Sequence, residues 1–258
     1  MLISGYPLWL VLVICVGVFC AGFVDSIGGG GGIISVPVYL LAGLPPHFAL
    51  GTNKLSSTLG TMISTFRYVK NKFVDWPLAI PAVILSLTGS WFGTKLQLMA
   101  DENLLKYVLL LVLPAVAVIL LKKKSFPETR GEMNPALRYA VVSGFSLVIG
   151  CYDGFYGPGT GTFLLLVFCF LAKMDVRSAS GNMKLVNLAS NIGAVTTALF
   201  AGKVLVPIGI IAALFSIAGH YIGAGLTIKN GTKIVRPVIF TVLLLLAVKI
   251  LLELFGVL

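Results

Sequence analysis

Two aspartates, each followed by a cluster of glycines, are the residues of this chain whose types and spacing best suit chemistry. Asp25 precedes an unbroken run of five glycines, and Asp153 precedes a second, interrupted cluster 128 residues later. Successive backbone N–H groups in a glycine-rich turn can form a concavity that binds an anion. The alternative is that the glycines only allow tight turns and close helix packing. The candidate anion-binding residues are Gly29, Gly30, Gly31, Gly157, Gly159 and Gly161.

A second matched block follows each glycine cluster and adds side chains that suit an oxyanion. The first copy reads Gly-Thr-Asn-Lys and ends at Lys54, and the second reads Gly-Asn-Met-Lys and ends at Lys184. Each block is expected to open a spanning helix, where the helix dipole also favours an anion. The lysines are expected either to balance the substrate charge or to extend to the membrane surface from a helix end. The predicted substrate-binding residues here are Thr52, Asn53, Lys54, Asn182 and Lys184.

A polar stripe continues along the helix that follows each block. Asn187 and Asn191 stand one turn apart and share a face with Lys184, and Ser57 and Thr61 have the same spacing in the first half. Such stripes either line a cavity or bond helices together. We include Asn187 and Asn191 among the candidate substrate-binding residues.

The two aspartates have two interpretations. A carboxylate inside a membrane is costly and usually functional, which would suit coupling to a proton or a sodium ion. The second interpretation, which we favour, is a structural cap in which the carboxylate accepts hydrogen bonds from the amides of the glycine turn. An ionised Asp25 or Asp153 beside an anion site would repel the substrate unless it were turned away.

The composition is that of one integral membrane protein. The 258 residues are 58% hydrophobic and 11% charged, and the mean hydropathy is +1.02, whereas a soluble domain carries roughly 25% charged residues. The net charge of +10 lies in short loops between apolar segments, so membrane topology explains it better than nucleic-acid binding. The four cysteines and two histidines have no metal-ligand spacing, and no cofactor motif or catalytic set is present. No basic stretch precedes residues 8–24, so we expect this segment to belong to the mature fold.

Ten apolar segments are expected, five in each half: 8–24, 33–44, 50–66, 77–98 and 104–121, then 139–152, 161–172, 182–201, 205–228 and 236–255. The domains are therefore a first repeat (1–121), a cytoplasmic linker (122–138) and a second repeat (139–258). Segments 33–44 and 161–172 are too short to cross a hydrocarbon core of about 30 Å. Each is expected to form a re-entrant hairpin with the segment before it, or else to cross where the membrane is thin.

The basic residues predict the orientation. Thirteen of the 19 lie in alternate loops, which the positive-inside rule places in the cytoplasm, with both termini outside. An odd number of crossings in each half makes the second copy inverted relative to the first, so the two glycine loops approach the midplane from opposite faces. The thirteen are Arg67, Lys70, Lys72, Lys122, Lys123, Lys124, Arg130, Arg138, Lys173, Arg177, Lys229, Lys233 and Arg236.

Over essentially the whole chain, these motifs resemble the TauE/SafE sulfite exporter family. The resemblance lies in the glycine run after Asp25, the block ending at Lys54, the glycine cluster after Asp153, and the stretch from Lys184 to Asn191. It implies a transporter of the bacterial inner (cytoplasmic) membrane for small sulfur-containing anions such as sulfite, sulfoacetate or other organosulfonates. Pro158 and Thr160 interrupt the second glycine cluster, which leaves open whether both loops contact substrate equally.

The resulting expectation is an all-α integral membrane protein, built as two inverted-topology repeats, that exports small anions by alternating access. The alternative function is a passive anion channel with the same central site. A membrane-embedded enzyme is not expected, because the chain shows no catalytic set. The expected partners are the anion, the lipid bilayer and a coupling proton or sodium ion, and a homodimer stays open beside a monomer.

Overall fold

The computed structural model describes residues 2–101, 126–235, 237–238 and 241. Within them the chain is almost entirely helical, as expected, apart from a two-stranded hairpin, β1 (Leu2–Ile3) and β2 (Tyr6–Pro7). The expected segment 104–121, most of 236–255 and linker residues 122–125 lie outside the described residues. The helices of the first half are α1 (Leu8–Gly28), α2 (Gly32–Leu41), α3 (Pro46–Lys70) and α4 (Trp76–Met99). Those of the second are α6 (Pro135–Phe155), α7 (Thr160–Leu166) with the π-helical turn η1 (Val167–Leu171), α8 (Val176–Phe200) and α9 (Val206–Asn230).

Within the described part of the chain, four helices, α1, α4, α6 and α9, are long and apolar enough to cross a membrane. Their outward faces carry large apolar side chains, including Leu12, Val16, Ile84, Val148 and Leu214. The interior, by contrast, holds many buried hydroxyl, amide and charged groups, mostly on α3 and α8. Apolar surfaces outside and polar groups inside are what a lipid environment requires.

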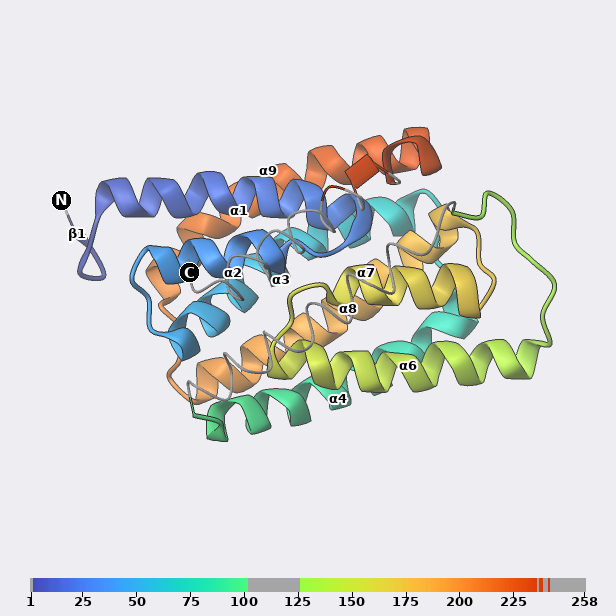
Figure 1. Cartoon of the computed structure of the whole chain (residues 1–258), viewed down its shortest axis with the longest axis horizontal. Helices are drawn as coiled ribbons and strands as arrows, with labels where there is room; N and C mark the ends of the chain where they lie inside the picture. Colours follow the sequence, from blue (N-terminus) through green and yellow to red (C-terminus); the bar gives the residue numbers. More distant parts are fainter. Residues whose placement is uncertain (1, 102–125, 236, 239–240, 242–258) are drawn as a thin grey trace, which may run out of the picture.

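The helices pair across the two halves, and each pairing occurs twice. In Figure 1, α1 (blue) lies along α9 (orange) at one edge, and α4 and α6 (green) lie together at the opposite edge, with α3 and α8 between them. If α1, α3 and α4 of the first half correspond to α6, α8 and α9 of the second, the α1–α9 contact corresponds to the α4–α6 contact. The α3–α9 contact corresponds in the same way to the α4–α8 contact. Small residues allow this close packing, since a Cβ on Gly154 of α6 would overlap the backbone of Ser90 in α4.

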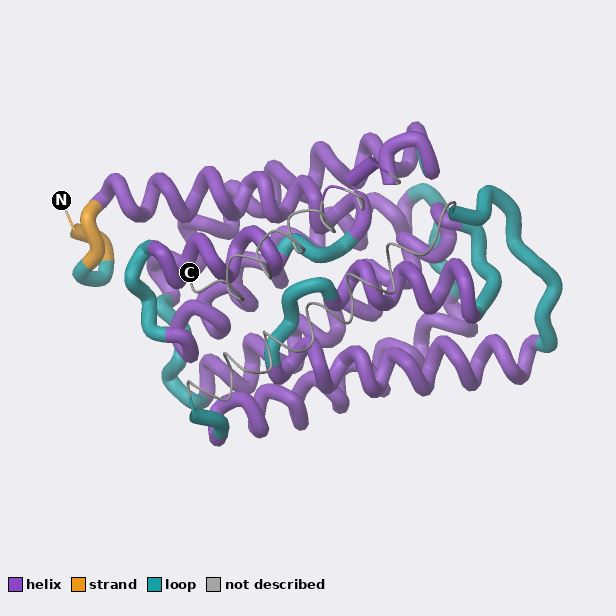
Figure 2. The backbone as a smooth tube through the Cα atoms, viewed as in Figure 1, coloured by secondary structure: helices purple, strands orange, loops and turns teal. Residues whose placement is uncertain are grey.

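Each half begins with a helix that turns back at its glycine loop. After the loop, α2 runs back toward the end of the molecule where α1 begins, and α7 runs back toward the beginning of α6 (Figure 1). In each half, the two helices joined by the glycine loop therefore form a hairpin. α1 and α6 also run in opposite directions, while the inverted repeat itself stays a prediction. Figure 2 shows both loops (teal) midway along the molecule, with helices on either side.

Several expected helix boundaries are wrong. The segments expected to end at 24 and 152 end later, because α1 continues through Asp25 to Gly28 and α6 continues through Asp153 to Phe155. The spanning segments expected to start at 50 and 182 start earlier, at Pro46 and Val176. Pro46 stands at the first helical position, where proline costs no hydrogen bond, and the Asp175 carboxylate caps α8 by accepting the amides of Arg177 and Ser178.

Several basic residues of the loops predicted to be cytoplasmic lie at one end of the molecule. There Arg130 of the linker pairs with Asp75 before α4, and Arg138 of α6 donates to the carbonyl of Ala172 after η1. Arg177 of α8 donates to the carbonyl of Lys229 near the end of α9. The loops predicted to be cytoplasmic therefore meet at a common end. The described linker residues 126–134 are irregular, and α6 begins at Pro135, inside the linker range expected from the sequence.

Candidate functional site

The two glycine loops touch at the centre of the molecule. Gly29 has a positive φ of 75°, and a Cβ there would overlap the backbone of Gly161. A Cβ on Gly161 would in turn lie 2.7 Å from the Cα of Gly29. The Thr162 hydroxyl donates to the Gly28 carbonyl at 3.0 Å and fastens the two loops together. Glycine is needed at both positions because the main chains themselves make this contact.

A small cavity of about 30 Å³ opens beside this crossing point. Many of the candidate residues expected from the sequence line it: Gly30, Gly31, Gly157, Gly159, Gly161, Asn53, Lys54, Asn187 and Asn191, together with Asp25 and Asp153. The amides of Gly30 and Gly159 donate to no other backbone group among the described residues. Both glycines have positive φ, 85° and 89°. The cavity therefore combines unused amides with amide and hydroxyl side chains.

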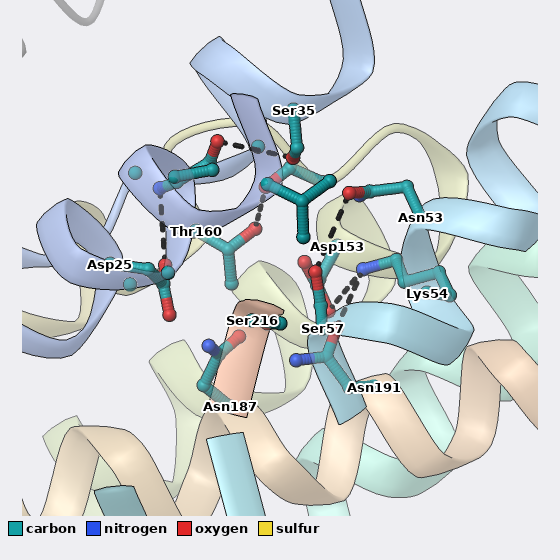
Figure 3. A pocket seen from close by; sticks show the side chains of 18 of the residues that line it. Asp25, Ser35, Asn53, Lys54, Ser57, Asp153, Thr160, Asn187, Asn191 and Ser216 are labelled. Atoms are coloured by element: carbon teal, nitrogen blue, oxygen red, sulfur yellow. Dashed lines mark hydrogen bonds and ion pairs between the residues drawn. The ribbon is translucent and has the colours of Figure 1, made fainter. Parts of the chain in front are cut away.

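The lysine of each matched block pairs with the aspartate of the other half. Lys54 Nζ of α3 lies 2.7 Å from Asp153 Oδ2 of α6, and Lys184 Nζ of α8 lies 2.5 Å from Asp25 Oδ2 of α1. Lys54 also donates to Asn191 Oδ1 at 3.1 Å, as Figure 3 shows. Neither lysine reaches the membrane surface, because Lys54 is 7% exposed and Lys184 is fully buried. Their charges are balanced by the two carboxylates.

Asp25 serves two further contacts. Its Oδ1 accepts the amide of Gly31 at 3.1 Å, which is the capping contact favoured from the sequence. Its Oδ2 lies 3.2 Å from Nε2 of His220 on α9. The carboxylate thus holds the first glycine loop in shape and links α1 to α8 and α9. The Gly31 amide, expected to face a solute, is taken by this cap.

Thr52 and Asn182 do not line the cavity. Thr52 Oγ1 accepts the amide of Leu205 before α9, and Asn182 Oδ1 accepts the amide of Asp75 before α4. The preceding glycine of each block lets the same connecting loop approach, since a Cβ on Gly51 would overlap Lys203 and one on Gly181 would overlap Phe73. These four residues therefore anchor the loops between helices. Lys184 and Gly29 also lie just outside the cavity lining.

The matched blocks lie inside helices rather than at their first turns. Because α3 begins at Pro46 and α8 at Val176, Lys54 and Lys184 stand in the third turn. Backbone amides at this depth bond within the helix, so the block offers side chains and not amides to a solute. The expected contribution of a free first turn is wrong for this reason.

Sequence reasoning missed several residues of the cavity. Ser35, Thr160, Ser216 and His220 all line it. A signal for two of them was present, because Ser216 to Gly223 repeats the pattern of Ser86 to Gly93, with serine at the first position and glycine at the fourth and the eighth. This third matched block marks the helix that faces the centre.

Comparison with known proteins places the chain. The model of the sulfite exporter TauE/SafE family matches residues 14–250. The chain belongs to this family. It is 35% identical over 242 residues to a probable membrane transporter protein of a Sinorhizobium species, covering 94% of this chain and 92% of that protein.

Two further relatives carry similar names. The probable membrane transporter protein YfcA of Escherichia coli is 32% identical over 237 residues, covering 92% of this chain and 87% of its own. A probable membrane transporter protein of Haemophilus influenzae is 32% identical over 231 residues, covering 89% of each chain. No solved structure matches the chain. The family member described here is thus a multi-pass membrane protein of the transporter class.

Proposed function

We propose that this TauE/SafE family member is a secondary transporter that exports small sulfur-containing anions such as sulfite, sulfoacetate or other organosulfonates across the inner membrane. The observation that carries the proposal is the cavity at the contact between the two glycine loops. Gly30 and Gly159, whose amides donate to no described backbone group, line it, as do Asn53, Asn187 and Asn191. Hydrogen-bond donors fixed around a small space are suited to the oxygens of a sulfite or sulfonate group.

The position of the cavity suggests how it could open to either side. It lies where two re-entrant hairpins from the two halves meet, and inverted repeats of this kind commonly form a midplane site that is exposed alternately. The contacts that would have to change are the reciprocal ion pairs, because Lys54–Asp153 and Lys184–Asp25 both bridge the halves.

The test is binding of a panel of sulfur oxyanions and organosulfonates to the purified protein, measured as thermal stabilisation. A ligand at about 100 times its Kd stabilises the folded state by about 2.7 kcal/mol. The variant Asn187→Leu, which keeps the side-chain volume but removes the amide, should lose this stabilisation. The control variant Asn71→Leu, at the end of α3 and outside the cavity, should keep it. If no anion of the panel stabilises the wild type, or if both variants bind alike, the assigned site is wrong.

Reconstitution in liposomes separates the carrier from the channel. Saturable counterflow of a labelled anion against an unlabelled one supports the carrier. Single-channel conductance would instead support a passive pore through the same site.

A further inference from the structure

The fixed charges around the cavity sum to zero, so they do not neutralise the charge of a bound anion. Lys54 and Lys184 contribute two positive charges, and Asp25 and Asp153 contribute two negative charges at distances of 2.5 and 2.7 Å. Among the described residues that line the cavity, His220 is the remaining side chain with a charge that can change. Histidine is also the side chain whose charge normally changes between pH 5 and 8.

The surroundings of His220 suit the charged imidazolium. The residue is 2% exposed, its Nδ1 lies 2.9 Å from the carbonyl oxygen of Ser216, and its Nε2 lies 3.2 Å from Asp25 Oδ2. Both neighbours are acceptors, and a neutral imidazole can donate from only one nitrogen. Only the doubly protonated ring satisfies both contacts by donation. The hydroxyls of Thr61 and Ser216 lie at 3.5 and 3.3 Å and adjust to either state.

The fold makes room for this ring. A Cβ on Gly22 of α1 would lie 2.7 Å from His220 Nδ1, and a Cβ on Gly60 of α3 would lie 2.5 Å from it. Two neighbouring helices therefore carry glycine where the imidazole sits. Because these glycines come from elements of the first half and His220 from the second, the slot exists only in the assembled protein.

The equivalent position in the other half holds no titratable group. In the matched block, Ser90 of α4 corresponds to His220, and its hydroxyl donates to the carbonyl of Ser190 at 2.5 Å. Ser190 itself stands where the first half has Gly60, so the slot is filled there. In the ion pair Lys54–Asp153, the additional hydrogen bond is made by Lys54, which donates to Asn191 Oδ1. The pseudo-symmetric site therefore has one ionisable imidazole and not two.

The charged and titratable groups that surround His220 come from four other helices. Asp25 on α1 contacts it directly, and Lys184 on α8 acts through that carboxylate. Lys54 on α3 and Asp153 on α6 line the same cavity as a pair. Tyr68 on α3 interacts electrostatically with Asp25, and its hydroxyl donates to the Ser26 carbonyl. A change of charge on His220 thus changes the net charge of the site from zero to plus one.

We propose that His220 binds the proton that accompanies the transported anion. The inference rests on the proposed function, because it assigns the coupling ion of that same site. As the anion enters, a ring nitrogen takes a proton from water on the entry side, and the proton returns to water on the exit side when the anion leaves. Anion and proton then strengthen each other's binding by the same factor. A monoanion moves with no net charge, and a dianion moves with one negative charge.

The direct test is the protonation state of His220 in nanodiscs, observed by ¹⁵N NMR of the imidazole. The chain has two histidines, and His47→Gln leaves His220 as the single signal. His47 contacts Gln97 and does not line the cavity, so this variant should leave anion binding unchanged. We expect the ring to change protonation between pH 5 and 9. At a pH near the midpoint, saturating methanesulfonate, a permanent monoanion, should increase the doubly protonated fraction.

A signal that stays in one protonation state from pH 5 to 9 would overturn the proposal, whether or not an anion binds. So would an unchanged protonated fraction when thermal stabilisation shows that methanesulfonate or sulfite has bound. If neither anion binds, the proposed function fails for them, while the pH titration alone still decides whether His220 is a proton site.

Transport in proteoliposomes provides the second readout. With wild-type protein, methanesulfonate flux should carry protons into a trapped pH indicator, respond to a pH gradient and ignore a potassium diffusion potential. Binding should strengthen as the pH falls, by up to about tenfold per pH unit for one linked proton. His220→Gln removes the ionisable ring, so the anion flux that this variant retains should carry no protons and should not depend on pH. Proton movement retained in His220→Gln would refute the assignment.

Discussion

Removing one member of the buried pair Lys54–Asp153 should destabilise the protein more than removing both. The atoms Nζ and Oδ2 lie 2.7 Å apart, and the side chains are 9% and 3% exposed. At an effective dielectric constant of about 20, this distance corresponds to an attraction of about 6 kcal/mol before desolvation is counted. Most of that attraction offsets the cost of burial. A lone charge left behind has no such offset and costs about 3–5 kcal/mol.

The assay is thermal unfolding of Lys54→Met, Asp153→Asn and the double variant in the same detergent. At about 2–4 °C per kcal/mol for a chain of this size, each single change should lower the Tm by roughly 6–20 °C. The double variant should unfold at a higher temperature than either single variant. Arg130→Met is the matched control, because its partner Asp75 and Arg130 itself are 28% and 42% exposed, and exposed pairs contribute about 0–1 kcal/mol.

A double variant whose loss equals the sum of the two single losses would refute the reasoning. The lysine and the aspartate would then stabilise the protein independently, and the pair would not couple the halves.

Three further expectations follow from the packing and the topology. Gly154→Ala should lower the Tm strongly because its Cβ would overlap α4. Gly144→Ala on the same helix has open space around it and should stabilise the protein by up to about 1 kcal/mol. Equal effects of the two changes would contradict the α4–α6 contact. Thr52→Ala should lower the Tm while leaving the anion Kd within about twofold, since one hydrogen bond to a loop costs about 1 kcal/mol; a large rise in Kd would return Thr52 to the binding site. In a cysteine-free background, an impermeant maleimide added outside should label Ala201→Cys but not Glu132→Cys, and the reverse result would invert the topology.

The sequence was sufficient for the helical class, the glycine loops and the residues of the ion pairs, because the duplication repeats each motif. Asp25 and Lys54 stood out together with their counterparts for this reason. Their partners were not predictable from the first half or the second half alone. The cross-pairing Lys54–Asp153 arises from the way the halves pack, and residues so far apart in the chain carry no local sign of it.

The roles of the second block were only partly predictable. Thr52 and Asn182 have the polar side chains that a solute would need, but their carboxamide and hydroxyl oxygens accept loop amides instead. Which of the two a polar residue does depends on the rotation of its helix. The expected starts of these two helices were four to six residues too late, although Pro46 and Asp175 were available as start signals. The side chains that face the cavity could therefore not be told from those that face the loops.

The reciprocal pairing has a consequence for biogenesis. When the ribosome has finished only the first half, Asp25 and Lys54 are already in the chain, but Lys184 and Asp153 have not yet been synthesised. The first half is therefore in the bilayer or its insertion machinery before the counterions of Asp25 and Lys54 exist. Quality-control proteases that recognise exposed intramembrane charge would remove a truncated product, while two separately expressed halves would protect each other.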